Sequence, residues 1–290
     1  MQVILNGLVT GLGLALLAAA FAVVYLPTRV FHIGLAGIYA AVPYVALTAT
    51  QKGASVPAAI LLAIGAGVIL SLLCDLLNHR RLTRTGASAG AHLIASLGIF
   101  IVLVQVVALS FGNESQVLRT GIDTTATIAG AVLTRTQIVS AVVGAVCLGA
   151  YLTWLHFTGI GLQLRALADN PTEVALRGYN VRHLHLLAFG ISGLLGSVAA
   201  LLAAYDVGFE PNGGLPVLLL AIVAVIIGGR KSFLGPLLGG ILLGLVRNLV
   251  VWHWSAKWQE AVTFVLLALA LLFVPNGILG RKARLEVNAS

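Results

Sequence analysis

Charged side chains are scarce in this chain, and several of them gather in one polar stretch between two long apolar runs. This stretch, residues 159–185, contains five charged side chains: Arg165, Asp169, Glu173, Arg177 and Arg182. Such a concentration of charge in an otherwise apolar chain predicts a surface that meets a partner protein. An ordinary solvated loop that carries topology-setting charge is the alternative, and composition alone leaves it open.

The local sequence of this stretch predicts two short helices with a sharp break between them. Residues 162–168 suit a helix, and Asp169-Asn170-Pro171 offers an N-cap side chain followed by a proline that fits a first helical turn. Glu173 then lies in the first turn of a second helix, where the helix dipole favours a negative charge, and Gly178 is placed as its C-terminal stop. We therefore expect a compact helical hairpin outside the bilayer.

Ionisable residues inside the apolar segments would point to proton or ion coupling, because a charge at mid-bilayer costs roughly 2.5–3.5 kcal/mol. Asp75 lies near one end of its segment and Arg247 near the end of another, so both can reach an interface by snorkelling. No acidic residue sits centrally in any segment. This pattern argues against a proton- or sodium-driven transporter, although carbonyls and hydroxyls alone can also hold sodium.

Six of the seven histidines fall at the predicted ends of apolar segments, and His183-x-His185 has no cysteine or carboxylate at ligand spacing. No metal site is predicted. His32 is the exception, because it begins an apolar segment among the helix-loosening residues Gly34 and Gly37. It is a candidate for lining a transport path, and a structural role is the alternative.

Catalytic constellations are absent from the sequence. There is no nucleophile elbow, no paired carboxylate within an apolar segment and no Gly-x-x-x-x-Gly-Lys-Ser/Thr loop. The run Gly229-Arg230-Lys231-Ser232 has arginine where the glycine before the lysine is required. The chain is therefore predicted not to be an enzyme and to bind no cofactor, and any ATP that drives it would be bound by another chain.

Composition identifies the kind of protein in which these residues are placed. Hydrophobic residues make up 59% of the 290 residues and charged residues only 9%, so the chain is predicted to be a polytopic membrane protein without a separate soluble domain. The net charge of +8 is read as a topology signal rather than as a nucleic-acid surface, because the basic residues fall between apolar runs. Cys74 and Cys147 lie inside apolar runs and are expected to pack as small apolar residues.

The expected fold is an all-α bundle that forms one transmembrane domain, residues 1–290, with eight or nine crossing segments. The apolar segments are residues 3–25, 31–49, 56–77, 91–111, 138–157, 186–205, 215–229, 234–252 and 261–274. The second, seventh and ninth are short or interrupted by glycine and proline, so broken or re-entrant helices are expected among them. Small residues recur at four-residue spacing, as in Gly7 and Gly11 or Gly240 and Gly244, which predicts tight helix packing.

The connections alternate in charge and predict the orientation. Residues 78–92, 159–185, 230–231 and the C-terminal tail, with Arg281, Lys282 and Arg284, are basic and are placed in the cytoplasm. If all nine segments cross, the N-terminus lies outside; if residues 31–49 do not cross fully, it lies inside. The sequence leaves both alternatives open.

Four motifs, taken in order, resemble one known family. They are Asn6-Gly7-Leu8, then Arg165-Ala166-Leu167-Ala168-Asp169-Asn170 with Ala175 and Gly178, then Gly228-Gly229 followed by Gly235-Pro236-Leu237-Leu238-Gly239-Gly240, and finally Pro275-Asn276-Gly277-Ile278-Leu279-Gly280-Arg281. Together they are similar to the permease subunits of ATP-binding cassette (ABC) importers for branched-chain amino acids, a family related to the ribose-type sugar permeases. The likeness spans nearly the whole chain.

The resemblance implies a bacterial inner-membrane protein whose hairpin couples it to a cytoplasmic ATPase. The implied coupling residues are Arg165, Ala166, Asp169, Asn170, Glu173, Ala175 and Gly178. The implied partners are a second homologous permease chain, two ABC ATPase subunits that bind ATP and magnesium, and a periplasmic substrate-binding protein. Membrane lipid surrounds the bundle, and no nucleic acid is expected.

One segment departs from the family pattern. Where the family commonly reads Asn-Phe-Ala-His-Gly, this chain has His32-Ile33-Gly34-Leu35-Ala36, followed by the familiar Tyr39. We expect small and weakly polar residues to line a path for alternating access, namely His32, Gly34, Gly37, Ser96 and Ser192. The alternative function is a stand-alone channel or secondary transporter for a small neutral solute such as urea, which would leave the hairpin without a role.

Overall fold

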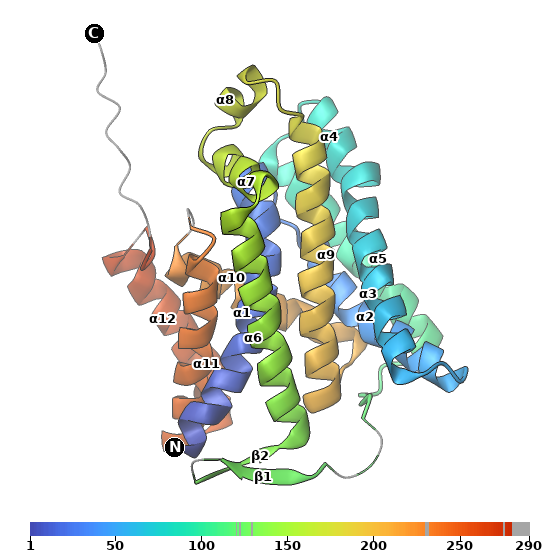
Figure 1. Ribbon diagram of the computed structural model, residues 1–290, viewed down its shortest axis with the longest axis vertical. Coiled ribbons are helices and arrows are strands. Elements are labelled where there is room, and N and C mark those ends of the chain that lie inside the picture. The colour runs from blue at the N-terminus through green and yellow to red at the C-terminus, as the bar shows by residue number, and fades with distance from the viewer. Residues whose placement is uncertain (120, 122, 129, 230–231, 275, 280–290) are drawn as a thin grey trace.

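A computed structural model describes residues 1–119, 121, 123–128, 130–229, 232–274 and 276–279, and almost all of its regular structure is helical (Figure 1). The long helices are α1 (Gln2–Thr28), α2 (Gly34–Gln51), α3 (Val56–Leu73), α5 (Ala89–Phe111), α6 (Arg135–Phe157), α9 (Val181–Asp206), α10 (Gly214–Gly228), α11 (Gly235–His253) and α12 (Gln259–Phe273). The short helices are the π-helical η1 (Cys74–His79), α4 (Arg80–Arg84), α7 (Gly159–Asp169), α8 (Pro171–Leu176), and the 3-10 turns η2 (Pro211–Gly213) and η3 (Ala256–Trp258).

Eight helical stretches within the described residues are long and apolar enough to cross a membrane. The expected all-α polytopic fold is therefore confirmed. The remaining apolar segment, the second (residues 31–49), forms α2, a helix of 18 residues that carries Pro43 in its interior. It lies inside the bundle, in contact with α3, α5, α9 and α10, so neighbouring helices rather than lipid cover most of it.

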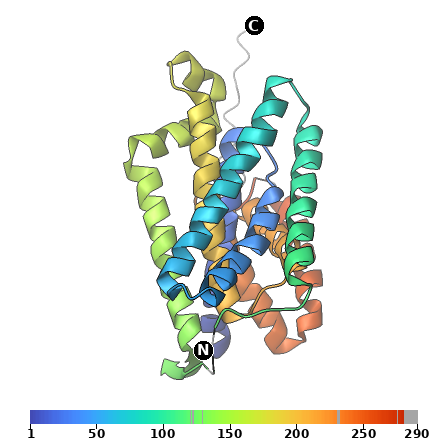
Figure 2. The same cartoon turned by 90° about the vertical axis from the view of Figure 1, so that its right-hand side faces the viewer.

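The two ends of the bundle carry different connections (Figures 1 and 2). The helices α4, α7 and α8 lie at one end, and the N-terminus lies at the opposite end with the two strands β1 (Thr125–Ile128) and β2 (Ala131–Thr134). This arrangement is the one expected when all nine segments cross. With the basic connections in the cytoplasm, the α7–α8 end is the inner end. Two basic regions used in that assignment, residues 230–231 and 281–284, lie outside the described residues.

Helix α1 forms the centre of the bundle, and its packing depends on glycine. Residues 15–24 of α1 are all almost completely buried. A Cβ atom at Gly7 would lie 2.9 Å from Cα of Leu245, and one at Gly11 would lie 2.9 Å from Cα of Ile241. The backbones of α1 and α11 approach too closely for a larger residue, as the small-residue spacing predicts.

Helix α10 is short and begins inside the bundle. Its 15 residues span about 22 Å, less than the roughly 30 Å of a hydrocarbon core. A Cβ at Gly214, its first residue, would collide with the carbonyl group of Ala36 near the start of α2. The second and seventh segments, which were expected to be short or broken, thus form α2 and α10, and the first turns of these two helices meet in the interior of the bundle.

The structure differs from expectation in two places. Strands β1 and β2 pair in an antiparallel arrangement, with Thr125 opposite Thr134, where only a connection was expected. The third segment continues as helix through η1 and α4 to Arg84, which shortens the predicted basic connection. His79 and His92, placed by the sequence at helix ends near water, are consequently only 2% and 7% exposed.

Candidate functional site

The predicted hairpin consists of α7 and α8, and their ends are capped by their own side chains. Thr158 begins α7, and its hydroxyl accepts a hydrogen bond from the Gly161 N–H at 3.0 Å. Asn170 separates the two helices, and its Oδ1 accepts from the N–H groups of Thr172 at 3.1 Å and Glu173 at 3.3 Å. These caps fix the angle at which the chain reverses.

Gly178 ends the second helix in the backbone conformation that favours glycine. Its φ is +82°, and its N–H donates to the carbonyl of Ala175 at 3.0 Å, while the Tyr179 N–H donates to that of Val174 at 3.3 Å. Any residue with a Cβ is strained in this region. The chain can therefore leave α8 in the direction of α9 at little cost.

The base of the hairpin is anchored to the bundle. Leu164 and Leu167 are fully buried and Val174 is 4% exposed. Arg29, at the end of α1, donates from Nη2 to the carbonyl of Ala168 at 3.1 Å, and Arg165 donates from Nη2 to the carbonyl of His156 at 3.3 Å. These hydrogen bonds connect the hairpin directly to the ends of α1 and α6.

The face of the hairpin that points away from the bundle is exposed. Of the seven predicted coupling residues, Arg165 is half-buried and the other six are exposed: Ala166, Asp169, Asn170, Glu173, Ala175 and Gly178. Leu162 is 60% and Leu176 is 82% exposed. A groove of about 380 Å³ between the two helices is lined by Ala166, Asp169, Glu173 and their neighbours. Exposed leucines beside carboxylates at the inner end form a surface suited to a protein partner rather than to lipid.

The predicted path residues meet around the start of α2. His32 is fully buried, and its ring lies edge-on to Phe189 with ring centroids 4.9 Å apart. The Gly34 N–H donates to the Ser96 hydroxyl at 2.9 Å. Gly37 packs against Leu103 of α5. The structure therefore brings His32, Gly34 and Ser96 together in the interior.

Ser192 lies on α9 and is fully buried. Neither its hydroxyl nor either ring nitrogen of His32 has a hydrogen-bond partner among the described residues. Unpaired buried polar groups are costly and mark places where water or a ligand can be accommodated.

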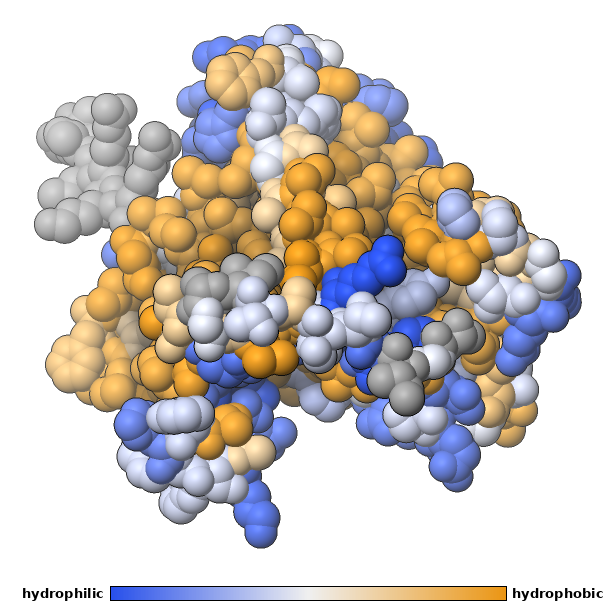
Figure 3. All heavy atoms as spheres, turned by 60° about the horizontal axis from the view of Figure 1, so that its bottom comes forward, coloured by the Kyte–Doolittle hydropathy of each residue, from blue (hydrophilic) through white to orange (hydrophobic). Residues whose placement is uncertain are grey.

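A cavity of about 600 Å³ opens near the outer end, and sequence reasoning did not find it. Its apolar wall comes from α1, α9 and α10, together with Tyr39 of α2. Its polar wall contains Thr10, Asp206, Glu210 and Arg247, but none of the five predicted path residues. The acidic turn formed by Asp206 and Glu210 was the available signal. Figure 3 brings the outer end of the bundle forward and shows hydrophilic residues at this end, while the flanks of the bundle are mainly apolar.

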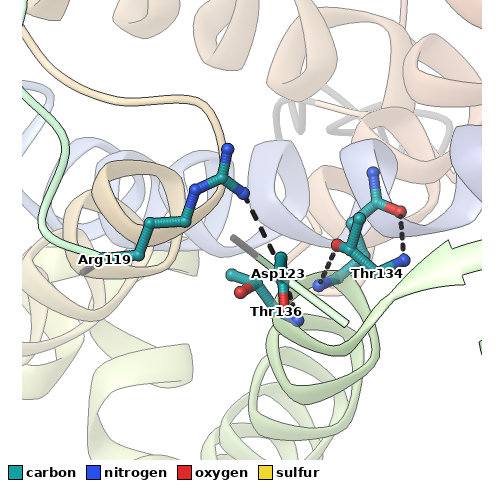
Figure 4. A network of polar contacts seen from close by, with 5 residues as sticks. Arg119, Asp123, Thr134 and Thr136 are labelled. Carbon is teal, nitrogen blue, oxygen red and sulfur yellow. Dashed lines mark hydrogen bonds and ion pairs between the residues drawn. The ribbon is translucent and has the colours of Figure 1, made fainter. Parts of the chain in front are cut away.

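A polar network secures the outer connection before α6 (Figure 4). The Thr136 N–H donates to Oδ2 of Asp123 at 3.1 Å, and Nη1 of Arg119 lies 3.8 Å from the same oxygen. Hydrogen bonding from Thr136, with a smaller contribution from Arg119, holds the pKa of Asp123 below its usual range. Thr134 and Gln137 complete a capping box at the start of α6.

The described part of the chain contains no group of three or more His, Cys, Asp or Glu side chains that could hold a metal ion. Cys74 and Cys147 are both free thiols. The candidate site thus consists of the exposed α7–α8 hairpin, a buried polar region and an outer cavity.

The fold and the hairpin together define a class, the multi-pass membrane permeases. A sequence model of the family described as "Branched-chain amino acid transport system / permease component" matches residues 3–271. The chain belongs to this family. It is a transporter subunit and a multi-pass protein of the inner membrane.

Individual relatives agree with this assignment. The chain is 29% identical to the high-affinity branched-chain amino acid transport system permease protein BraD of Pseudomonas aeruginosa over 294 residues, covering 97% of this chain and 96% of BraD. It is 29% identical to LivH of Escherichia coli K12 over 195 residues, covering 65% of this chain and 63% of LivH.

Among solved structures, PsaBC from Streptococcus pneumoniae in complex with Fab is similar to this chain. The TM-score is 0.53 with 16% sequence identity, and the match covers 94% of this chain and 92% of that chain. This likeness concerns the fold alone.

Proposed function

We propose that residues 1–290 form one permease domain of an ATP-driven importer that carries branched-chain or other small amino acids. The supporting observation is the capped and anchored α7–α8 hairpin, which leaves an open docking face at the inner end. A channel or a secondary transporter for a neutral solute does not need an exposed hairpin that connects it to an ATPase. The names of BraD and LivH support the class of cargo.

In this proposal, ATP and magnesium are bound by two partner ATPase subunits. A cleft in each ATPase receives a hairpin, in this chain through Arg165, Ala166, Asp169, Asn170, Glu173, Ala175 and Gly178. Closure and opening of the ATPase pair then move α7, and the contacts of α7 with α1 and α6 transmit this motion to the bundle. In this proposal the chain changes conformation to move the cargo, and the partner subunits hydrolyse ATP.

The cargo would pass by alternating access along the interface with a second homologous permease. A periplasmic binding protein would deliver it to the outer end, where the 600 Å³ cavity combines an apolar wall with charges of both signs. An apolar amino acid needs partners only for its zwitterion, which helix ends and a few polar groups can provide. His32, Gly34, Gly37, Ser96 and Ser192 would line the inner part of the path.

Purification from native membranes tests the proposal. We expect an ATPase and a second permease to co-isolate with this chain, and we expect amino-acid uptake in proteoliposomes only when ATP and the binding protein are supplied. Uptake by this chain alone, without ATP, would instead establish the stand-alone transporter.

A further inference from the structure

A second pocket at the inner end is strongly basic and lies apart from the groove of the hairpin. Its volume is about 400 Å³, and it lies between the continuous helix formed by α3, η1 and α4 and the beginning of α9. Its lining residues are Asp75, Arg80, Thr83, Arg84, Asn180, Arg182, His183, His185 and Leu186. Three guanidinium groups therefore face one carboxylate.

The positive charge of this pocket is only partly balanced within it, because Asp75 is the one acidic side chain in the lining against three guanidinium groups. Among the described residues, the side chains of Arg80, Arg84 and Arg182 form no direct ion pair and no hydrogen bond. The Nε atom of Arg80 is buried and has no partner among the described residues. The excess of positive charge favours a bound anion, and a buried N–H donor needs an acceptor.

The start of α9 adds to the positive potential of the pocket. Asn180 is the N-cap of this 26-residue helix, and its Oδ1 accepts from the His183 N–H at 3.2 Å. The amide Nδ2 of Asn180 donates to no other side chain or backbone group of the described residues. The positive end of the helix dipole thus lies beside Arg182, where it favours a bound anion.

The surroundings of the pocket select the kind of anion. Leu73, Leu76 and Leu77, on the turns just before Arg80, are 40%, 37% and 59% exposed, and Leu186 lines the pocket itself. Apolar side chains directly beside an arginine cluster, near the inner end of the bundle, match the chemistry of the boundary between acyl chains and head groups. Basic pockets between helices on the cytoplasmic side are typical sites for anionic lipid head groups.

We propose that this pocket binds the phosphate group of an anionic phospholipid of the inner leaflet. The planar forks of Arg80 and Arg84, four residues apart on one helical face, grip the phosphate oxygens from one side. Arg182 and the start of α9 hold it from the other side. The lipid then links the α3–α4 helix to α9 directly after the hairpin. This site does not depend on which cargo is carried.

Lipid retention tests the proposal on the complete membrane complex. The complex is equilibrated in vesicles of phosphatidylcholine and phosphatidylglycerol and extracted in neutral detergent, and the bound lipid is counted by native mass spectrometry. We expect the wild-type protein to retain phosphatidylglycerol. The double variant R80Q/R84Q should retain at least about tenfold less of this lipid, because the loss of each charged hydrogen bond lowers the affinity by about that factor. The matched control is R81Q, since Arg81 is exposed on the same helix and does not line the pocket.

Three results would overturn the proposal. The first is equal lipid retention by R80Q/R84Q and R81Q. The second is loss of the ATPase from R80Q/R84Q with the lipid retained, which would assign the pocket to a protein carboxylate. The third comes from delipidated protein, in which short-chain phosphatidylglycerol should raise the melting temperature of the wild type but not of R80Q/R84Q. If inorganic phosphate alone raises the melting temperature equally, free phosphate rather than a lipid occupies the pocket. Unchanged melting temperatures in neutral detergent establish that the variants fold.

Discussion

At the scale of single residues, the hairpin depends on a few side chains with separate local roles. Asn170 caps α8, Pro171 occupies its first turn, and Gly178 ends it with φ +82°. The proline and the glycine stop follow from residue type and spacing, so the sequence was sufficient to predict them, whereas it left the N-cap open between Asp169 and Asn170. The burial of His79 and His92 was not predictable, because it results from the packing of η1 against α5 rather than from any local pattern.

The first prediction concerns Gly178. Replacing it with alanine places a Cβ in the left-handed region, costs about 1 to 2 kcal/mol locally and turns the end of α8. We expect G178A to insert normally but to lose substrate-stimulated ATP hydrolysis in proteoliposomes. E173Q should lose part of it, because Glu173 is exposed at the groove.

The matched control is G53A. Gly53 also has a positive φ, +86°, and open space around it, but it lies in the turn between α2 and α3, away from the hairpin. Its backbone strain is comparable. If G178A and G53A hydrolyse ATP alike, the docking role of the hairpin is refuted.

The second prediction concerns Asp123 at the outer end. Its pKa is lowered in the folded protein, chiefly by hydrogen bonding from Thr136, so the charged form stabilises the fold at pH values above the ordinary pKa of about 3.9. That contribution is lost as the pH falls through the lowered folded pKa. Wild-type protein should therefore melt above D123N at pH 6, and the difference should shrink toward zero as the pH falls below the ordinary pKa of aspartate and through the lowered folded pKa. A difference that is independent of pH would show that the Asp123 charge contributes nothing.

At the scale of elements, the bundle is organised by close backbone contacts around α1. Gly11 and Gly244 face each other between α1 and α11, and Gly239 packs against the Ala224 carbonyl of α10. The four-residue spacing of small residues predicted such contacts but not which helices form them, because spacing on one helix carries no information about its neighbour. The start of α10 inside the bundle was likewise suggested only by the shortness of its segment.

The third prediction concerns this packing. A Cβ at Gly244 would collide with the backbone of Gly11, so G244A should cost about 1 to 3 kcal/mol through overpacking. We expect a clearly lower melting temperature in detergent. G149A is the control, because Gly149 is an exposed helical glycine with nothing within 4 Å of its added Cβ. G149A should be neutral or slightly stabilising, and equal losses in both variants would mean that the α1–α11 contact is not tight.

At the scale of the whole molecule, charge alternation predicted which connections share an end, and the structure groups the described ones accordingly. The choice between eight and nine crossings was not available from the sequence, because residues 31–49 are short and contain glycine and proline, and only the fold shows that other helices cover α2. The outer cavity escaped prediction for a related reason, since its lining comes from six long helices and the connections beside them, which only the fold brings together.

The fourth prediction concerns orientation. Leu176 on the hairpin and Val207 after α9 are 82% and 81% exposed at opposite ends of the bundle. In a background with Cys74 and Cys147 replaced by alanine, we expect V207C to react with an impermeant thiol reagent added outside the cells. L176C should react only after the membrane is permeabilised. The reverse pattern would invert the topology.

The two introduced cysteines, L176C and V207C, also show directly whether a cytoplasmic ATPase moves this chain through the α7–α8 hairpin. The purified complex carrying L176C or V207C is treated with a bifunctional thiol reagent, with and without ATP, and its products are identified by mass spectrometry. We expect L176C to form a cross-link to the ATPase whose yield changes with ATP and V207C to form none. Absence of any ATPase cross-link from L176C, in a complex that still transports, would rule out coupling through the hairpin.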